Sequence, residues 1–589
     1  MDSYRFGTVD YIVLVGMTIL STGTGLYFGG IKKTSKHIDD VELTNIAKGK
    51  SLKQNFGSDK IDEYLMGSRN MNVVPVSISL IGSFVSGVTI MGIPSEIYHY
   101  GTQYFLVIMP IILQGIAISY IYLPVYSALK VHSAYQYLEM RFNSSVRTIA
   151  SFMFIFSTVS YMPFVIYVPA LALNQVSGLN SHLIEVLIVL ACVSYTLMGG
   201  LKAVVHTDVW QMVVMFFSVT AVAVFALLYS NGFGALFEDV EKGGRLILAN
   251  TNASPYVRHT LWSVLIGGFS YWTSINVTNQ AMVQRYMSLP SLKKSRDSLY
   301  LFTVGITIFV ALCCFLGLLI FEKYKDCDPL SAGLIAHDDQ LLPLFVVETV
   351  GHIYGMPGLF IAGIFGAGLS TLSSCFNTVA LVFLEDIVRG CLKLQPSERV
   401  STILIKSSIV FQGVMAFLLV FLIRELRGVL SVCNSIASIT AGTALGIFTL
   451  GMLVPWSNTV GTATGGIISI ILAAWLSFGS QIAAALGQLS SQMLPVSVEG
   501  CLGNVTTPQK HWVDQEEVFP LYRLSYHWIN PIGVVTTVVV GALVSLVTKP
   551  TDIKTINSKL ISPVIHRFLP RECFRDLHFN EESLKKVFK

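Results

Sequence analysis

Charged residues are scarce in this sequence. Only 13% of its 589 residues are Asp, Glu, Lys or Arg, while 53% are hydrophobic and the mean hydropathy is +0.63. Soluble domains carry about 25% charged residues, so this composition excludes a soluble globular protein. The apolar runs also lack the polar alternation of membrane β-strands and are about twice as long as such strands. The chain is therefore predicted to be an all-α polytopic membrane protein.

Motifs of catalysis and redox chemistry are missing as well. No activated nucleophile, metal-ligand cluster or phosphate-binding loop is visible, so we expect neither enzyme activity nor an organic cofactor. The nine cysteines contain no CxxC pair, and we expect most of them to pack within helices. The start, Met1 to Arg5, lacks the basic region and cleavage pattern of a signal peptide. The first apolar run is therefore expected to remain as a spanning helix.

Long apolar runs are what the sequence has in quantity. About thirteen of them are long enough to cross ~30 Å of hydrocarbon. They cover residues 11–29, 75–97, 104–127, 148–176, 182–198, 208–229, 261–283, 299–321, 357–388, 402–423, 429–454, 459–478 and 529–547. These runs predict about thirteen transmembrane helices in a lipid bilayer.

Lys and Arg indicate the orientation of these helices. The segment 30–73 contains eight of them, so the positive-inside rule places it in the cytoplasm and the N-terminus outside. Thirteen crossings then bring the basic tail, 548–589, to the cytoplasmic side, and alternation puts Arg285 on that side too. Because the basic runs follow this rule, they give no indication of a nucleic-acid partner. The predicted location is the plasma membrane.

Two long loops, 231–260 and 479–528, are then expected to be extracellular. Each carries a glycosylation sequon, at Asn252 and at Asn504. Cys327 and Cys501 also fall in predicted outer loops, where oxidation is allowed. A disulfide between them is one possibility.

Polar residues interrupt the ninth apolar run, where residues 368–378 read GLSTLSSCFNT. Ser370, Ser373, Ser374 and Asn377 recur at i, i+3, i+4 and i+7, so they share one face of a helix. Such residues can serve packing, because their hydroxyls often bond the carbonyl four residues back. Hydroxyl oxygens are also the ligands that a hard cation such as sodium requires when it sheds water.

Two other runs contain residues that favour unwinding of a helix. Run 75–97 has three glycines, mid-helix serines and Pro94, and run 261–283 has the same character. Unwound backbone within a bilayer is tolerated only where it lines a cavity, and secondary transporters use it to bind ions. The two runs lie five helices apart, which suggests two five-helix repeats, 74–230 and 261–454, the second inverted.

Several segments carry a resemblance to a known family. They are PVSISLIGSFVSGVTIMGIPSEIYHYGTQY (75–104), YTLMGGLKAVVHTDVWQ (195–211), TNQAMVQRYMS (278–288), AGLSTLSSCFNTVA (367–380), LGIFTLGMLVPWSNTVG (445–461), LPVSVEGC (494–501) and YRLSYHWINPIG (522–533). They resemble the sodium:solute symporter family, in its sodium-coupled monocarboxylate and multivitamin transporter arm. The resemblance implies a LeuT-like core of five plus five helices in inverted repeats. One helix with a basic loop (1–73) precedes this core, and two accessory helices (455–547) follow it.

The family's motifs place a sodium site on five residues of this chain. The resemblance implies that the backbone oxygens of Gly82, Val85 and Ala367 and the hydroxyls of Ser370 and Thr371 bind the ion. Asp208 matches a family acidic residue associated with a second sodium or with coupling, and Ser374 is assigned to the same role. Asp208 could instead be an interfacial carboxylate near Lys202.

A substrate site is expected at the two interrupted helices and on the helix that begins at 429. A carboxylate would be held there by backbone N–H groups, hydroxyls and the bound sodium. Phe84 could equally be ordinary packing. The candidate substrate residues are Ser83, Phe84, Ser86, Thr89, Ser274, Asn276, Asn434 and Ser435.

The predicted function is sodium-coupled import of a small organic anion, a monocarboxylate or a carboxylate vitamin such as biotin or pantothenate. The coupling ion is Na⁺. Two alternatives remain open at this point: a sodium symporter for an inorganic anion such as iodide, and a sodium-responsive sensor that binds solute without transport. The sequence does not indicate the oligomeric state.

Overall fold

A computed structural model describes residues 6–27, 69–129, 131–230, 232–423, 429–489, 492–501 and 518–569. These residues form helices and connecting loops and contain no strand. The helices of the first half are α1 (Thr8–Leu26), α4 (Val73–Phe84), α5 (Gly87–Tyr100), η3 (Thr102–Val107), α6 (Ile108–Ala117), η4 (Ile118–Tyr122), α7 (Leu123–Leu129), α8 (Gln136–Arg141), α9 (Ser144–Ser177), α10 (Ser181–Tyr229) and α11 (Phe233–Lys242). Those of the second half are η5 (Ser263–Gly267), α12 (Gly268–Thr278), α13 (Gln280–Met287), α14 (Leu292–Tyr324), η6 (Asp338–Gln340), α15 (Leu341–Val350), α16 (Met356–Val382), η7 (Phe383–Cys391), α17 (Glu398–Ile423), α18 (Val429–Leu453), α19 (Thr459–Ala485), η9 (Pro520–Arg523), η10 (Tyr526–Trp528), α20 (Ile529–Val547), η11 (Ile553–Thr555), η12 (Ser558–Leu560) and η13 (Pro563–Phe568).

A helical segment lies at each of the thirteen predicted apolar runs. Ten segments of the described chain are long and apolar enough to span a membrane, and the bent pair α4–α5 makes an eleventh. The other two predicted runs correspond to α1 and to the interrupted segment η5–α12–α13. Two of the ten, Ser181–Met198 and Ala203–Tyr229, belong to one helical element, α10. The chain is a multi-pass membrane protein.

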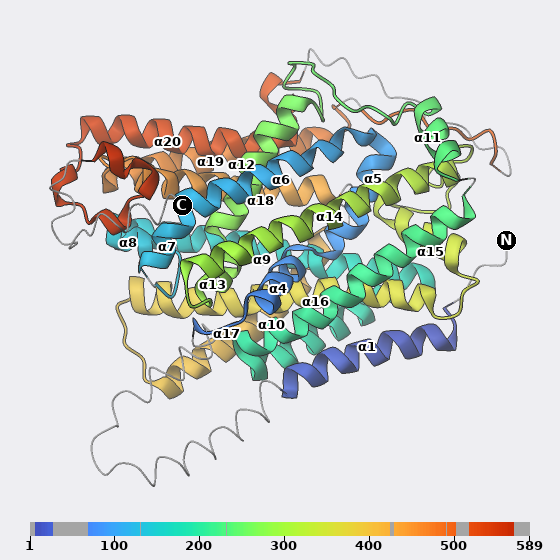
Figure 1. The fold of residues 1–589 in the computed structure, drawn as a ribbon, viewed down its shortest axis with the longest axis horizontal. Coiled ribbons are helices and arrows are strands. Elements are labelled where there is room, and N and C mark those ends of the chain that lie inside the picture. Colours follow the sequence, from blue (N-terminus) through green and yellow to red (C-terminus); the bar gives the residue numbers. More distant parts are fainter. Residues whose placement is uncertain are drawn as a thin grey trace, which may run out of the picture.

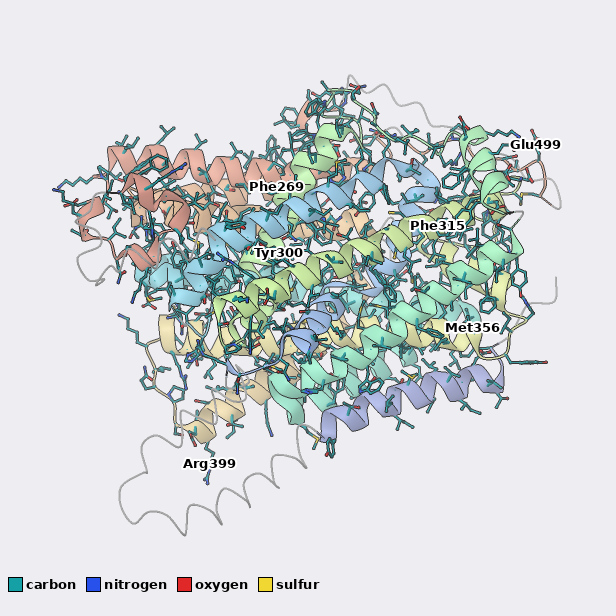
Figure 2. The ribbon with its side chains drawn as sticks, viewed as in Figure 1. Phe269, Tyr300, Phe315, Met356, Arg399 and Glu499 are labelled. Atoms are coloured by element: carbon teal, nitrogen blue, oxygen red, sulfur yellow. A yellow bond between two sulfur atoms is a disulfide. The ribbon has the colours of Figure 1, made fainter. Side chains whose placement is uncertain are left out.

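The surface of the bundle suits contact with lipid. Large apolar side chains are exposed along the helices, among them Phe269 and Tyr300 (Figure 2). Exposed charged residues such as Arg399 and Glu499 lie toward opposite ends of the long axis (Figure 2). This distribution matches a bilayer, whose apolar layer is bounded by water on both sides.

The helices are arranged so that the two halves of the chain meet in the middle. Figure 1 shows α1 along one side of the bundle and α20 along the opposite side, with α4, α9 and α16 between them. Helix α16 packs against both α9 and α10, and α18 packs against α12 and α20. Helix α16 also packs against α4 and α5, which places its polar face close to the break between them.

The two loops predicted to be extracellular lie together at one end. The N–H of Arg258 donates to Oε1 of Gln492 (2.7 Å), and the N–H of Ser525 donates to the carbonyl of Pro255 (3.0 Å). A disulfide joins Cys327, after α14, to Cys501 in the second loop. Asn252 is exposed in the first loop. Asn504 and residues 28–68, most of the predicted cytoplasmic basic loop, lie outside the described residues.

Candidate functional site

The second apolar run is broken where the sequence predicts an interruption. Helix α4 ends at Phe84, α5 begins at Gly87, and their directions differ by 60°. Between them, Val85 (φ −74°, ψ 116°) and Ser86 (φ −113°, ψ 174°) are extended. Gly87 packs so closely on α9 that a Cβ there would lie 2.9 Å from Cγ1 of Val168. The break therefore opens the backbone inside the bundle and not at its surface.

The hydroxyl-rich face of α16 lies against this break. Oγ1 of Thr371 donates to the carbonyl of Val85 (3.4 Å), and a Cβ at Gly82 would lie 3.3 Å from Oγ of Ser370. Ala367, one turn earlier on α16, is buried. The oxygens of Thr371 and Val85 are 3.4 Å apart. A cation that lies about 2.4 Å from each of them would bind both at an angle of about 90°. This distance and this angle are normal for oxygen ligands of a hard cation. The geometry fits one hard cation between the two segments.

Asp208 of α10 is buried beside these hydroxyls. Its Oδ1 accepts a hydrogen bond from Ser370 (2.6 Å), and its Oδ2 accepts from Ser79 (2.6 Å) and Ser83 (3.2 Å). The side chain has no exposed surface. The carboxylate of Asp208 is therefore enclosed by protein, where it faces the hydroxyls of α4 and α16.

Arg285 is a buried partner of Asp208 that the sequence analysis placed at the cytoplasmic side. Its Nη2 donates to Oδ2 of Asp208 (3.0 Å) and to Oγ of Ser374 (2.7 Å), and its Nε donates to Ser79 (2.9 Å). The residue is 1% exposed. Asp208 begins one apolar run (208–229) and Arg285 follows another (261–283) by two residues, and opposite charges at such positions are a signal for a pair, since neither is stable alone in the bilayer.

The seventh run is also interrupted, at Asn279. Helix α12 ends at Thr278 and α13 begins at Gln280, while Asn279 itself is extended (φ −75°, ψ 120°) and caps α13 through its side chain. The carbonyl groups near the break accept hydrogen bonds from Tyr126 (to Val277, 2.9 Å) and Tyr135 (to Thr278, 2.7 Å). The break places Arg285 on a short helix that turns toward Asp208.

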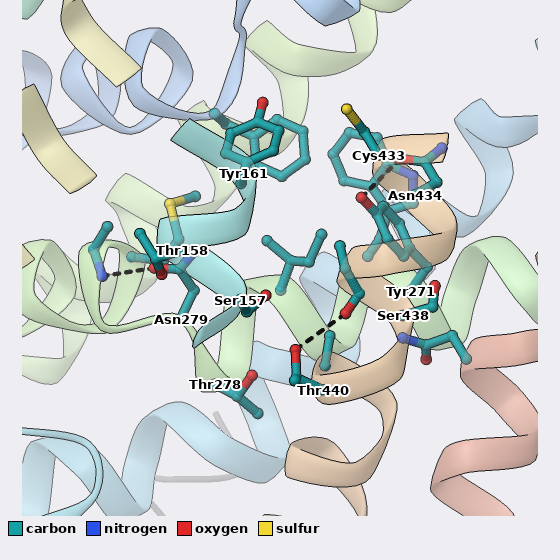
Figure 3. Close-up of a pocket in the computed structure, with 18 of the residues that line it drawn as sticks. Ser157, Thr158, Tyr161, Tyr271, Thr278, Asn279, Cys433, Asn434, Ser438 and Thr440 are labelled. Atoms are coloured by element: carbon teal, nitrogen blue, oxygen red, sulfur yellow. Dashed lines mark hydrogen bonds between the residues drawn. The ribbon is translucent and has the colours of Figure 1, made fainter. Parts of the chain in front are cut away.

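A cavity of about 190 Å³ lies between the two interrupted helices, α9, α16 and α18. This volume exceeds the space that a few waters need and suits a small solute. Figure 3 shows Thr158 and Tyr161 of α9 on one side and Cys433, Asn434 and Ser438 of α18 on the other. The hydroxyl of Tyr271 donates to Oδ1 of Asn434 (2.9 Å), which joins α12 to α18 on that side of the cavity.

Half of the predicted substrate residues line this cavity. Ser83, Phe84, Thr89 and Asn434 belong to its wall. Phe84 also stacks on Trp272 with ring centres 4.5 Å apart, so it both packs and faces the cavity.

The other four predicted substrate residues, Ser86, Ser274, Asn276 and Ser435, do not line the cavity. Three of them turn toward their own helices: Ser274 donates to Ser270, Asn276 to Trp272 and Ser435 to Ser431. Ser86 accepts a hydrogen bond from Tyr161 (2.7 Å). Each of the four makes a hydrogen bond within the protein, although Oδ1 of Asn276 has no partner among the described residues.

The wall of the cavity carries no Asp, Glu, Lys or Arg among the described residues. Its polar groups are hydroxyls, amides and one imidazole, that of His527, and aromatic rings such as Tyr104 and Trp272 supply much of the rest. An organic anion in this space would meet no fixed cationic side chain. Its charge would need a mobile counter-ion.

A buried polar cluster lies beside the cavity where the loop before η5 meets α5. Arg258 donates from Nε and Nη2 to the two carboxylate oxygens of Glu96 (2.6 and 3.0 Å) and covers the ring of Tyr100 at 4.1 Å. Nε2 of His259 lies 2.7 Å from Glu96, and its Nδ1 lies 3.2 Å from Nε2 of His527. Burial lowers the pKa of His259, which keeps its ring neutral at physiological pH. This cluster fixes the loop against the cavity wall.

The fold and this site define a cation-coupled symporter with two interrupted helices. The solved substrate-bound, outward-open structure of a Na⁺-coupled sialic acid symporter matches 93% of this chain and 100% of its own, with a TM-score of 0.71 and 23% identity. This likeness shows the inverted-repeat, LeuT-like fold. The family model of the sodium:solute symporter family matches residues 64–469. The chain belongs to this family.

Two curated mouse proteins show how similar the chain is to its relatives. Sodium-coupled monocarboxylate transporter 2 is 34% identical over 567 residues, which cover 96% of this chain and 88% of the relative. Sodium-coupled monocarboxylate transporter 1 is 34% identical over 573 residues, which cover 93% of this chain and 89% of the relative.

Proposed function

We propose that this chain is a sodium-coupled symporter that imports a small organic anion across the plasma membrane by alternating access. The solute is a monocarboxylate or a carboxylate vitamin such as biotin or pantothenate. Membership of the sodium:solute symporter family and full-length similarity to sodium-coupled monocarboxylate transporters support this function. The observation that carries it is the contact of Thr371 with the carbonyl of Val85 at the break between α4 and α5.

Sodium binds, in this proposal, between the break and α16. Its ligands are the carbonyls of Gly82, Val85 and Ala367 and the hydroxyls of Ser370 and Thr371. Binding there joins the bent helix α4–α5 to α16, so the ion stabilises one arrangement of these segments over the other. A second sodium or a coupling role is assigned to Asp208 and Ser374, which both contact Arg285 and the hydroxyl of Ser83.

The sodium ion also supplies the positive charge that the cavity wall lacks. Thr371, Ser83 and Ser374 belong to that wall, so an ion at the break lies next to the solute space. An anion that binds beside the ion raises the affinity for sodium by the same factor as sodium raises the affinity for the anion. This reciprocity couples the two fluxes without a cationic side chain.

The membrane potential adds to the driving force. The N-terminus is proposed to be outside and the C-terminus in the cytoplasm, so sodium entering from the outer loops moves down its electrical gradient. Each elementary charge that moves inward releases ~2.3 kcal/mol of electrical free energy per 100 mV of membrane potential. More than one sodium per monovalent anion makes the cycle electrogenic.

Uptake in cells without a background carrier tests the proposal. Labelled lactate, nicotinate, biotin, pantothenate and iodide are supplied with sodium or with choline in its place. The proposal expects sodium-dependent accumulation of at least one of the organic acids. Accumulation of iodide alone indicates an inorganic-anion symporter. If none accumulates although the protein is at the surface and changes conformation with sodium, the chain is a sensor.

A further inference from the structure

The short helix η10 and the start of α20 form part of the cavity wall. His527 and Asn530 line the cavity together with Tyr271 and Trp272 of α12. Helix α20 lies outside the two five-helix repeats, so the repeat architecture alone does not bring it to the solute space. The packing of this chain must therefore bring α20 to the cavity.

Two glycines allow this segment to pack closely against its neighbours. A Cβ at Gly267 would lie 2.4 Å from the carbonyl oxygen of His527, and one at Gly442 would lie 2.5 Å from that of Asn530. Even alanine would collide with backbone at both positions. Asn530 is therefore held between α12 and α18, the two helices that carry the cavity residues Tyr271 and Asn434.

Only one of the two polar atoms of the Asn530 side-chain amide has a hydrogen-bond partner among the described residues. Its Oδ1 accepts from the hydroxyl of Ser270 (2.6 Å), which orients the amide, and lies 3.0 Å from Oγ of Ser274. Its Nδ2 has no hydrogen-bond partner among the described residues, although Asn530 is 1% exposed. A buried donor without a partner is destabilising, because no hydrogen bond offsets the loss of its hydration. Since Asn530 lines the cavity, the free donor is available to a molecule inside it.

We propose that Asn530 is a specificity-determining residue, which donates a hydrogen bond from Nδ2 to an acceptor atom of the transported anion. This inference rests on the proposed function and deepens it. The carboxylate lies beside sodium at the α4 and α16 side of the cavity. The acceptor is a second group, a carbonyl oxygen or a ring nitrogen, at the α12, α18 and α20 side. The preferred solutes are monocarboxylates that carry such an acceptor.

Two pairs of acids that differ in the acceptor test the inference. Nicotinate and benzoate differ by a ring nitrogen, and 4-oxopentanoate and pentanoate differ by a carbonyl oxygen. Sodium-dependent uptake of the four labelled acids is measured for the wild type, Asn530→Leu and Asn530→Asp. The control is Thr537→Val, a buried position on the same helix whose hydroxyl donates to its own helix at Gly533 (2.9 Å).

The expected result is a wild-type preference for the acceptor-bearing acid of at least one pair, by roughly tenfold in apparent affinity. Asn530→Leu removes this preference, and Thr537→Val keeps it. Asn530→Asp keeps an acceptor oxygen for Ser270 and Ser274 but has no N–H donor, so it should also lose the preference. This variant serves as the second test if Asn530→Leu does not reach the cell surface. A preference that survives in both Asn530 variants, or equal wild-type affinities within both pairs, overturns the inference. Absence of sodium-dependent uptake of any acid by the wild type contradicts the proposed function instead.

Discussion

The buried pair of Asp208 and Arg285 gives a prediction whose magnitude follows from the structure. Both side chains are enclosed, with exposures of 0% and 1%, and each is the other's only charged hydrogen-bond partner among the described contacts. Arg285→Met leaves the carboxylate with three hydroxyl donors and no counter-ion. Asp208→Asn leaves the guanidinium with two hydroxyls and the carbonyl of Ala281. Removing one member of a buried pair costs about 3–5 kcal/mol.

The double variant should be more stable than the two single effects predict. With Asp208→Asn and Arg285→Met together, no charge is left buried at this position. The expected interaction energy is about 2 kcal/mol or more in favour of the double variant.

The assay is the thermal unfolding midpoint of detergent-solubilised protein, measured for the wild type, both single variants and the double variant. Both singles should melt clearly below the wild type, and the double variant should melt above the lower of the two. Strictly additive losses would refute the reasoning, because they would mean that the two charges do not depend on each other in the fold.

Three further predictions concern the end of the bundle where the loops around Arg258 and Cys501 lie. Glu96→Gln leaves Arg258 without its counter-ion, so it should lower the melting temperature more than Arg258→Lys, which keeps the charge; the reverse order would contradict the role of the pair. Burial, with Asp338 alongside, raises the pKa of Asp339 to about 7. The folded state therefore binds a proton that the unfolded state releases near pH 4, and stability should fall as the pH rises from about 4 to about 7. Asp339→Asn should flatten this pH dependence of the melting temperature, and an unchanged slope would exclude Asp339 as its source. Cys327→Ser and Cys501→Ser should lower the melting temperature equally, and the double variant should lower it no further, since all three lack the same bond; an added loss in the double variant would show that the thiols act separately.

The sequence predicted the helices well because the bilayer imposes a simple rule on length and hydropathy. All thirteen apolar runs are helical, and the glycines and serines of run 75–97 predicted its interruption, whereas Pro94 lies inside α5 and not at the break. The stripe of hydroxyls on α16 predicted that a polar partner lies opposite it. These features are local, so residue spacing is enough to indicate them.

Features that depend on helix rotation and long-range packing were not predictable in the same way. Arg285 follows the break at Asn279, and only the turn of α13 brings it to Asp208. Ser274 and Ser435 are polar residues on the expected helices, yet both point away from the cavity. Asn530 reaches the cavity because Gly267 and Gly442 admit α20, a contact between segments far apart in the chain.

The sodium concentration that gives half-maximal uptake tests the central claim most directly. The comparison is Thr371→Val, which removes one hydroxyl at constant volume, with Thr303→Val, where an equally buried hydroxyl donates to its own helix at Leu299 (2.9 Å). If a sodium ion lies between the break at Val85 and the hydroxyls of α16, Thr371→Val should raise this concentration roughly tenfold or more, while Thr303→Val leaves it unchanged. Equal sodium dependence in the wild type and in Thr371→Val, with both proteins at the surface, would contradict the account.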